Sequence, residues 1–135
     1  MATGMIYGPI YLEHDTGTHI ENAGRLKSII SVLERSGFKN DLITIEPQAA
    51  PLEKLATVHS REHIDDMKRL SHEDARWLTL DTVISRASYD VALYAAGGAI
   101  QAVDLVMRGE LDNAFALVRP PGHHATHREA MGFCL

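Results

Sequence analysis

The sequence predicts an α/β domain in which helices cover a parallel sheet, and three observations support this. Strand-like and helix-like segments alternate along the chain, which is the order that βα units produce. Residues 114–118 are continuously apolar over the length of a strand, as expected for a strand covered on both faces. No internal repeat, low-complexity tract or linker interrupts this order.

The first part of the chain is expected to contain two strands and one long helix. Residues 5–7 predict a short strand, and residues 11–24 predict a loop because they lack a sustained apolar period. Residues 42–45 predict the second strand. Between the two strands, residues 22–36 predict a helix that Gly37 can end, because apolar side chains recur there on one helical face, namely Leu26, Ile29, Ile30 and Leu33.

Two shorter helices and a loop are expected next. Pro51 is suited to the first position of a short helix. Ser60 can cap the following helix, which is expected to end near Leu70. Residues 71–86 are polar and irregular, which favours a long loop that could rim a pocket.

Residues 89–108 predict a long helix that is buried on more than one face, because apolar residues lie on most of its sides. Gly97 and Gly98 stand in its middle, where each costs roughly 1 kcal/mol of helix propensity. This cost indicates that a neighbouring backbone packs closely against the helix there. Gly109 is expected to end the helix before the last strand.

Composition favours an ordinary globular domain. Of the 135 residues, 45% are hydrophobic and 23% are charged, which argues against disorder. The net charge of -5 and the absence of a basic stripe argue against a nucleic-acid surface. One cysteine excludes an internal disulfide, and no apolar run or charged leader predicts membrane insertion or export. A cytoplasmic protein is therefore expected, and association of the chain with itself stays open.

The last segment carries the chemistry. Pro120 and Pro121 cannot donate backbone hydrogen bonds and Gly122 tolerates unusual backbone angles, so the chain must leave the sheet after residue 118. His123 and His124 are then presented in a loop beyond the carboxyl end of a strand. Open α/β sheets place their active sites at this edge.

Two adjacent imidazoles on a rigid loop suit proton transfer. Neutral imidazole is a base near physiological pH, and its pKa moves readily with its surroundings. One histidine can accept a proton from water while the other stabilises developing negative charge. The alternative is a pair in a solvated loop without a chemical role, and the residues around the pair decide between the two interpretations.

The surrounding residues resemble the zinc-dependent histone deacetylase superfamily, in particular its class II-like branch with acetylpolyamine amidohydrolases and acetoin-utilisation proteins. The resemblance rests first on the segments 119–125 and 130–134. It extends over nearly the whole chain through Glu13-His14, His19 to Leu26, Val58-His59-Ser60, Leu80-Asp81-Thr82 and Ala95 to Ala99. It implies the amino-terminal part of an arginase/deacetylase-like three-layer α/β/α fold with a parallel sheet.

The resemblance also implies an activity, which is removal of acetyl groups from acetylated lysine or a small acetylated amine. In this family zinc polarises the acetyl carbonyl and lowers the pKa of a bound water. His124 would accept the proton of that water, and His123 would stabilise the tetrahedral intermediate. Which imidazole takes which step is left open, because two interacting groups titrate as a pair.

Four further residues receive roles by the same resemblance. Arg25 matches an arginine that lines an internal cavity for the released acetate, and Asp81 matches an aspartate that holds the substrate backbone at the pocket rim. Gly132 matches a position whose carbonyl can accept a hydrogen bond from the substrate amide, and Phe133 matches a wall of the lysine tunnel. The alternatives without a chemical role are a surface arginine for Arg25, a turn former for Asp81 and core packing for Phe133.

The zinc ligands of the family are expected outside this sequence. They are two aspartates and a histidine that follow the Gly132-Phe133-Cys134 motif, whereas His14 and His19 have no partner spacing for a metal site. Residues 1–135 are therefore interpreted as the amino-terminal portion of a single deacetylase domain, truncated after this motif and inactive without the rest. The alternative is a non-catalytic short homologue, either a pseudoenzyme or an interaction module.

Overall fold

Three parallel strands form the centre of the molecule in the computed structural model, which describes residues 1–135. They are β1 (Thr3–Ile6), β2 (Leu42–Ile45) and β5 (Asn113–Ala116), in the order β2-β1-β5. All three had been expected, and their bounds differ from the predicted ones by two residues or fewer. The predicted parallel α/β architecture is confirmed.

The central strand is the most buried of the three. Met5 of β1 lies opposite Thr44 of β2 on one side and opposite Phe115 of β5 on the other. Met5 and Ile6 are almost inaccessible to solvent, whereas Phe115 is 63% exposed. This contrast arises because β2 and β5 are edge strands, each with one neighbour only.

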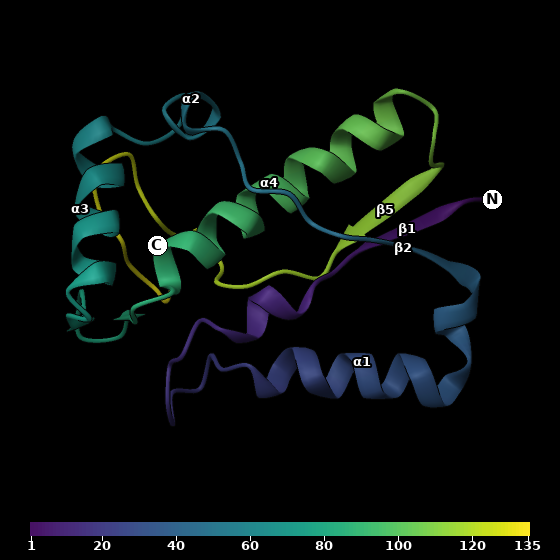
Figure 1. Cartoon of the computed structure of the whole chain (residues 1–135), viewed down its shortest axis with the longest axis horizontal. Helices are drawn as coiled ribbons and strands as arrows, with labels where there is room; N and C mark the ends of the chain where they lie inside the picture. The colour runs from purple at the N-terminus through teal and green to yellow at the C-terminus, as the bar shows by residue number, and fades with distance from the viewer.

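Two long helices lie on opposite sides of the sheet (Figure 1). They are α1 (Gly24–Ser36) and α4 (Ser88–Met107). Gly37 ends α1 with a left-handed backbone (φ 79°), as its position predicts. Side chains from the sheet, both helices and the segments that follow β1 and β5 meet in one core cluster, which consists of Met5, Tyr11, Leu26, Val91, Ala95 and Leu117.

Short helical segments complete the chain. The α2 turn (Leu52–Leu55) and helix α3 (Arg61–His72) follow β2, and the 3-10 turns are η1 (Pro9–Leu12) and η2 (Phe38–Asp41). The Ser60 side chain accepts a hydrogen bond from the backbone N–H of His63. Ser60 therefore caps α3 as predicted, since its oxygen satisfies a free donor of the first turn.

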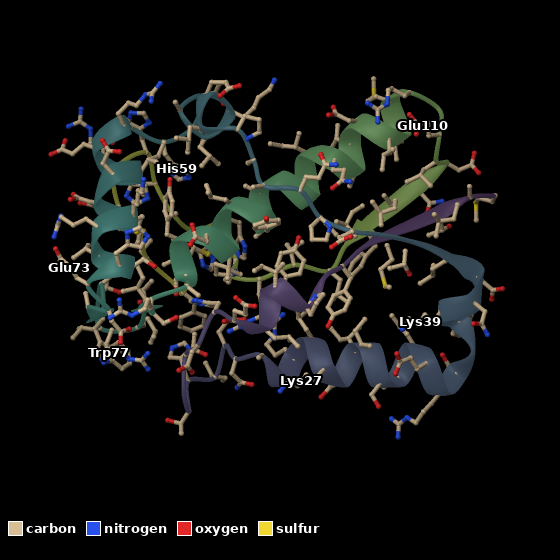
Figure 2. The ribbon with its side chains drawn as sticks, in the orientation of Figure 1. Lys27, Lys39, His59, Glu73, Trp77 and Glu110 are labelled. Atoms are coloured by element: carbon tan, nitrogen blue, oxygen red, sulfur yellow. The ribbon has the colours of Figure 1, made fainter.

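The prediction of an irregular loop over residues 71–86 was correct only in part, because short regular segments lie within it. The α3 helix continues to His72, and β3 (Arg76–Trp77) and β4 (Val83–Ile84) then form an antiparallel hairpin at its end, with Trp77 58% exposed (Figure 2). The buried hydroxyl of Ser71 lies 2.7 Å from the Ser85 carbonyl oxygen and holds β4 in place. Strands of two residues are too short to show an apolar period, so the sequence pattern missed them.

Helix α4 differs from its prediction in two respects. One face is open, because Val103 is 61% and Met107 is 80% exposed, so the helix is less covered than expected. It is also long and apolar enough to cross a membrane by length and composition, contrary to the expectation that no segment is. In this fold, however, its other face packs on the sheet and belongs to the core cluster.

The two glycines of α4 behave as predicted. A Cβ atom added to Gly97 would lie 1.9 Å from the carbonyl oxygen of Gln48, and one added to Gly98 would lie 2.7 Å from the hydroxyl of Tyr11. Both distances are far below van der Waals contact. The absence of side chains therefore lets the segment after β2 and the η1 turn approach the helix.

Candidate active site

The paired histidines lie where the sequence predicts, in the loop beyond the carboxyl end of β5. The rings of His123 and His124 are 4.1 Å apart between centroids and tilted by 57°, and both side chains are exposed. The chain leaves the sheet through Pro120 and Pro121, and the Arg119–Pro120 bond is cis. The two imidazoles are thus adjacent and accessible to solvent, and His123 also lines the pocket between α3 and α4.

His124 is oriented by the backbone of the following turn. Its Nδ1 atom lies 3.1 Å from the carbonyl oxygen of Gly132, and its backbone N–H donates to Cys134 Sγ at 3.3 Å. A carbonyl oxygen only accepts hydrogen bonds, so Nδ1 must carry the proton. The Nε2 atom of a neutral His124 is then unprotonated and can accept a proton from a bound water.

Glycine at position 132 is required by this arrangement. Gly132 has a left-handed backbone with φ 58°, and an added Cβ would lie 2.6 Å from His124 Nδ1. Its carbonyl, which the sequence analysis assigns to the substrate amide, here accepts from His124. A carbonyl oxygen has two lone pairs, so one acceptor position is left.

A relay of hydrogen bonds joins Asp81 to Phe133. The Thr82 hydroxyl donates to Asp81 Oδ1 at 2.9 Å and accepts from the backbone N–H of Phe133 at 3.1 Å. Hydrogen bonds from Thr79 and Thr82 lower the pKa of Asp81, so the exposed carboxylate stays ionised at neutral pH. The β3–β4 hairpin, which sequence reasoning missed, thereby brings Asp81 to the same loop as the histidine pair.

Phe133 sits in an unusual backbone conformation beside another imidazole. Its φ of 72° is costly for a bulky residue, by roughly 1–3 kcal/mol. Its ring meets His19 edge-on at 4.7 Å, and His19 Nδ1 accepts from the backbone N–H of Glu21. Phe133 is partly buried beside His19, and its role as a wall of the lysine tunnel stays a prediction.

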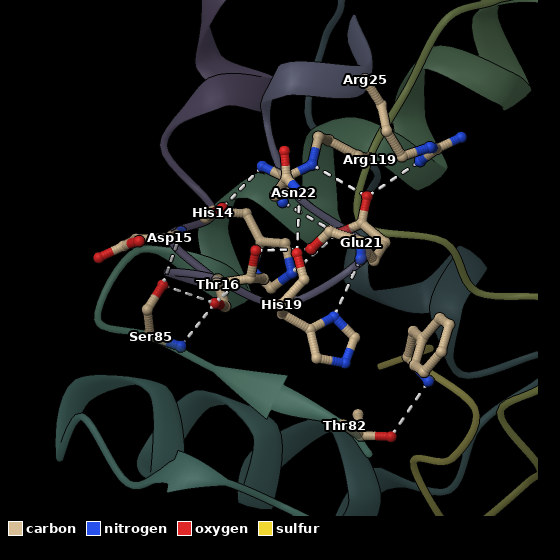
Figure 3. A network of polar contacts seen from close by, with 12 residues as sticks. His14, Asp15, Thr16, His19, Glu21, Asn22, Arg25, Thr82, Ser85 and Arg119 are labelled. Carbon is tan, nitrogen blue, oxygen red and sulfur yellow. Dashed lines mark hydrogen bonds and ion pairs between the residues drawn. The ribbon is translucent and has the colours of Figure 1, made fainter.

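Arg119 is the residue of this region that the sequence analysis did not single out. It is fully buried, and its guanidinium donates to both carboxylate oxygens of Glu21, at 3.1 and 2.9 Å, and to the carbonyls of Tyr11 and His14 (Figure 3). An arginine directly after a buried apolar strand needs an acidic partner, and this requirement could have identified Arg119 from the sequence. The contacts fix the strand end from which the histidine loop starts.

His14 belongs to the same buried network. Its Nδ1 atom lies 2.6 Å from the Ser88 hydroxyl at the start of α4. Its Nε2 atom lies 3.9 Å from Glu21 Oε2, and both residues are labelled in Figure 3. Burial, and then the charge of Arg119, lower the pKa of His14 to about 4. His14 is therefore neutral at physiological pH and acts in packing and hydrogen bonding.

Arg25 lies in the first turn of α1 and points to Glu21 (Figure 3). Its Nη1 atom donates to Glu21 Oε1 at 3.0 Å, and its side chain is 52% exposed. Glu21 thus holds both arginines, one buried and one at the surface. Arg25 does not line either of the two main pockets, and its acetate role stays a prediction.

Comparison with known proteins identifies the family. The histone deacetylase domain matches residues 19–135. This chain belongs to the histone deacetylase family. A probable deacetylase of Archaeoglobus fulgidus is 38% identical over 99% of this chain, and a histone deacetylase-like amidohydrolase of Pseudomonas aeruginosa is 39% identical over 86%.

Solved structures agree with the family in fold. The crystal structure of the HDA15 HD domain superimposes with a TM-score of 0.93 at 34% identity and covers 99% of this chain. That match spans 40% of the HDA15 chain, and this chain spans 38% of the Archaeoglobus protein and 30% of the Pseudomonas protein. The deacetylase fold is therefore confirmed for the part of the domain that these residues form.

The residues present do not fit a resident zinc ion. One group of three side chains brings possible ligand atoms within 4.8 Å of one another, namely His123, His124 and Cys134. His124 Nδ1 already faces a carbonyl, and the buried Cys134 sulfur accepts from a backbone N–H. No carboxylate joins the group, so it lacks the carboxylate and histidine set expected for this family.

Proposed function

We propose that this chain forms part of a zinc-dependent deacetylase that hydrolyses the acetamide of acetylated lysine or a small acetylated amine. The membership of the histone deacetylase family supports a hydrolase of this kind. The observation that carries the proposal is the adjacent, exposed imidazole pair with one ring locked by a backbone carbonyl. Zinc would be held by residues outside this chain, and it would supply Lewis acidity and a more acidic water.

The chain's own contribution to the reaction is proton transfer and charge stabilisation. His124 carries its proton on Nδ1, so its Nε2 accepts a proton from the attacking water and later protonates the departing amine. His123 is free to donate a hydrogen bond to the oxygen on which negative charge develops.

The remaining residues position the substrate in this proposal. The ionised Asp81 accepts hydrogen bonds from the substrate backbone at the rim, and Phe133 packs against the aliphatic chain that precedes the acetamide. Gly132 offers the second lone pair of its carbonyl to the substrate amide. Arg25, at the surface of residues 1–135, takes the released acetate once other polypeptide covers it.

A substrate panel on a polypeptide that unites this chain with the rest of a deacetylase domain tests the proposal. Acetyl-lysine peptides and acetylated polyamines are assayed for released acetate. We expect turnover of at least one class, and His124→Ala should reduce kcat by roughly a hundredfold or more while the zinc content stays the same. Retained turnover of His124→Ala would remove His124 from the mechanism.

The second candidate is a non-catalytic homologue that serves as an interaction module. Residues 1–135 bring no carboxylate into a group of possible metal ligands, and both candidates predict this. The gene beyond the codon of Leu135 separates the two candidates. An in-frame Asp-x-Asp-x-His segment supports the enzyme, whereas a stop codon directly after Leu135 favours the module.

A further inference from the structure

The loop that carries the histidine pair is joined to the turn before α3 by three hydrogen bonds. The backbone N–H of Ser60 donates to the carbonyl oxygen of His127 at 2.8 Å. The Nδ1 atom of His127 lies 2.6 Å from the carbonyl oxygen of Val58. The Nδ1 atom of His59 lies 2.8 Å from the carbonyl oxygen of Thr126. These five residues are called the loop anchor below.

Both imidazoles of the loop anchor are hydrogen-bond donors. A carbonyl oxygen only accepts, so the proton of His59 and that of His127 lies on Nδ1. Protonation of Nε2 leaves the Nδ1 proton in place, so each hydrogen bond also forms in the charged state of the ring. The loop anchor is therefore expected to hold throughout the pH range in which histidine titrates.

The histidine loop has no helix or strand of its own between residues 117 and 130. Most of its residues are exposed, including the histidine pair. Within the loop, the backbone N–H of Ala125 donates to Gly122 and that of Thr126 donates to Glu129. Such internal bonds shape the loop but do not fix it relative to the sheet or the helices. The loop anchor supplies a connection of that kind.

The loop anchor reaches the chain close to His124. Thr126 and His127 follow His124 by two and three residues, and Gly132 holds the His124 ring itself through its carbonyl oxygen at 3.1 Å. The other end of the loop anchor is a helix terminus, because the Ser60 side chain caps α3. His124 is thus held by the turn at Gly132 and, through the loop backbone, by the start of α3.

We propose that His59 and His127 are positioning residues for the reaction of the histidine pair. Their Nδ1–H groups hold the loop backbone against residues 58–60, so that His124 Nε2 meets the attacking water in the right orientation. Loss of either donor lets residues 125–129 move away from this turn, and the movement reaches His124 through the backbone. The inference deepens the proposed function and rests on it for the effect on rate, whereas the order of the loop can be measured without activity.

Nuclear magnetic resonance of the nitrogen-15-labelled 135-residue chain tests the loop anchor without activity. The ring nitrogen shifts of neutral His59 and His127 should show the proton on Nδ1. In His59→Leu and His127→Leu, hydrogen exchange at the backbone N–H groups of Ser60 and His124 should speed up by roughly tenfold or more, because leucine has no donor. His72→Leu is the control, since His72 is exposed at the end of α3, and it should leave both rates unchanged.

Kinetics of the polypeptide that unites this chain with the rest of a deacetylase domain test the effect on rate. His59→Leu and His127→Leu should each lower kcat by roughly tenfold or more, because a displacement of about 1 Å misplaces the proton acceptor. KM should change less, since neither ring is assigned to the substrate.

Asparagine provides the matched variants, because its side-chain N–H group can take the place of Nδ1 and restore the hydrogen bond. His59→Asn and His127→Asn should therefore recover most of kcat. Zinc content and Tm are measured for each variant, so that a loss of metal or of folded protein is recognised. His72→Leu should keep the kcat of the unchanged polypeptide.

The outcomes separate the loop anchor from the chemistry. Unchanged exchange at Ser60 and His124 in both leucine variants would overturn the inference. Equal losses of kcat in the leucine and asparagine variants would also overturn it, because the donors would then have no part in the rate. Faster exchange in the leucine variants, together with a united polypeptide that releases no acetate even when unchanged, would support the loop anchor and contradict the proposed function.

Discussion

Arg119 and Glu21 form a bidentate ion pair in the interior, 98 residues apart in the sequence. The Nε atom of Arg119 donates to Glu21 Oε1 at 3.1 Å, and Nη2 donates to Oε2 at 2.9 Å. Burial by itself raises the pKa of Glu21, but the hydrogen bonds and charge of Arg119 outweigh it and the pKa is lowered. The pair joins the end of β5 to the loop before α1.

Breaking this pair should destabilise the chain strongly. Arg119→Met leaves the Glu21 carboxylate buried without its main partner, and we expect a loss of about 3–5 kcal/mol in the free energy of unfolding. Urea denaturation followed by circular dichroism measures this loss. Arg25→Met is the control, because Arg25 contacts the same carboxylate from a half-exposed position and should cost about 1 kcal/mol or less. Equal losses in both variants would contradict the structure.

The buried His14 should make stability depend on pH. Its folded pKa of about 4 lies below the ordinary value of 6.5, so the unfolded chain binds more protons between these values. Stability is therefore retained above pH 6.5 and falls as the pH drops toward 4. The expected loss from His14 between pH 7.5 and 5 is about 2 kcal/mol. His14→Gln should reduce this slope in urea titrations, and an unchanged slope would show that His14 is not buried.

Gly97→Ala should disrupt the packing of α4 against the segment after β2. The added methyl group would lie 1.9 Å from the Gln48 carbonyl oxygen, so we expect a loss of about 2 kcal/mol or more despite the higher helix propensity of alanine. Thermal unfolding measures it. Gly122→Ala is the matched control, because nothing lies within 4 Å of its added Cβ. A Tm for Gly97→Ala at or above that of the unchanged chain would refute the close approach.

Gly132→Ala should impair catalysis in the united polypeptide by displacing His124. The added Cβ would lie 2.6 Å from His124 Nδ1, and a displacement of about 1 Å can cost a hundredfold in rate. Steady-state kinetics should show a fall in kcat and a changed pH profile. Gly109→Ala shares the positive φ, at 71°, but meets no atom within 4 Å. It should therefore lose stability and keep its kcat, whereas parallel losses would assign the effect to backbone strain.

The 135-residue chain should not bind zinc tightly. The only close group of possible ligands is His123, His124 and Cys134, and two of these are engaged with the backbone. Calorimetry with zinc should show no stoichiometric binding at micromolar or lower Kd. If binding at that level occurred and Cys134→Ser abolished it, the three residues would form a metal site in their own right.

Local patterns were sufficient for most of the elements. The helix over residues 24–36 follows from its apolar period and the glycine after it, and Ser60 was identified as a cap from its position alone. The loop with His123 and His124 could also be predicted, because two consecutive prolines cannot donate the backbone hydrogen bonds that continue a strand. These features depend on residues a few positions apart, and such neighbours stay neighbours in any fold.

Tertiary structure decided which distant residues meet. Glu21 accepts hydrogen bonds from both Arg119 and Arg25. The Thr82 hydroxyl connects Asp81 with the backbone of Phe133. The hairpin over residues 76–84 was not expected from the sequence. Each contact joins segments separated by a long stretch of chain, and its geometry depends on the packing of the helices and the sheet between them. The sequence by itself determined the fold class, the family and the position of the histidine loop. Only the folded chain determined how that loop is held, because a buried charge or a hydroxyl has many possible partners in the sequence and packing selects a few of them.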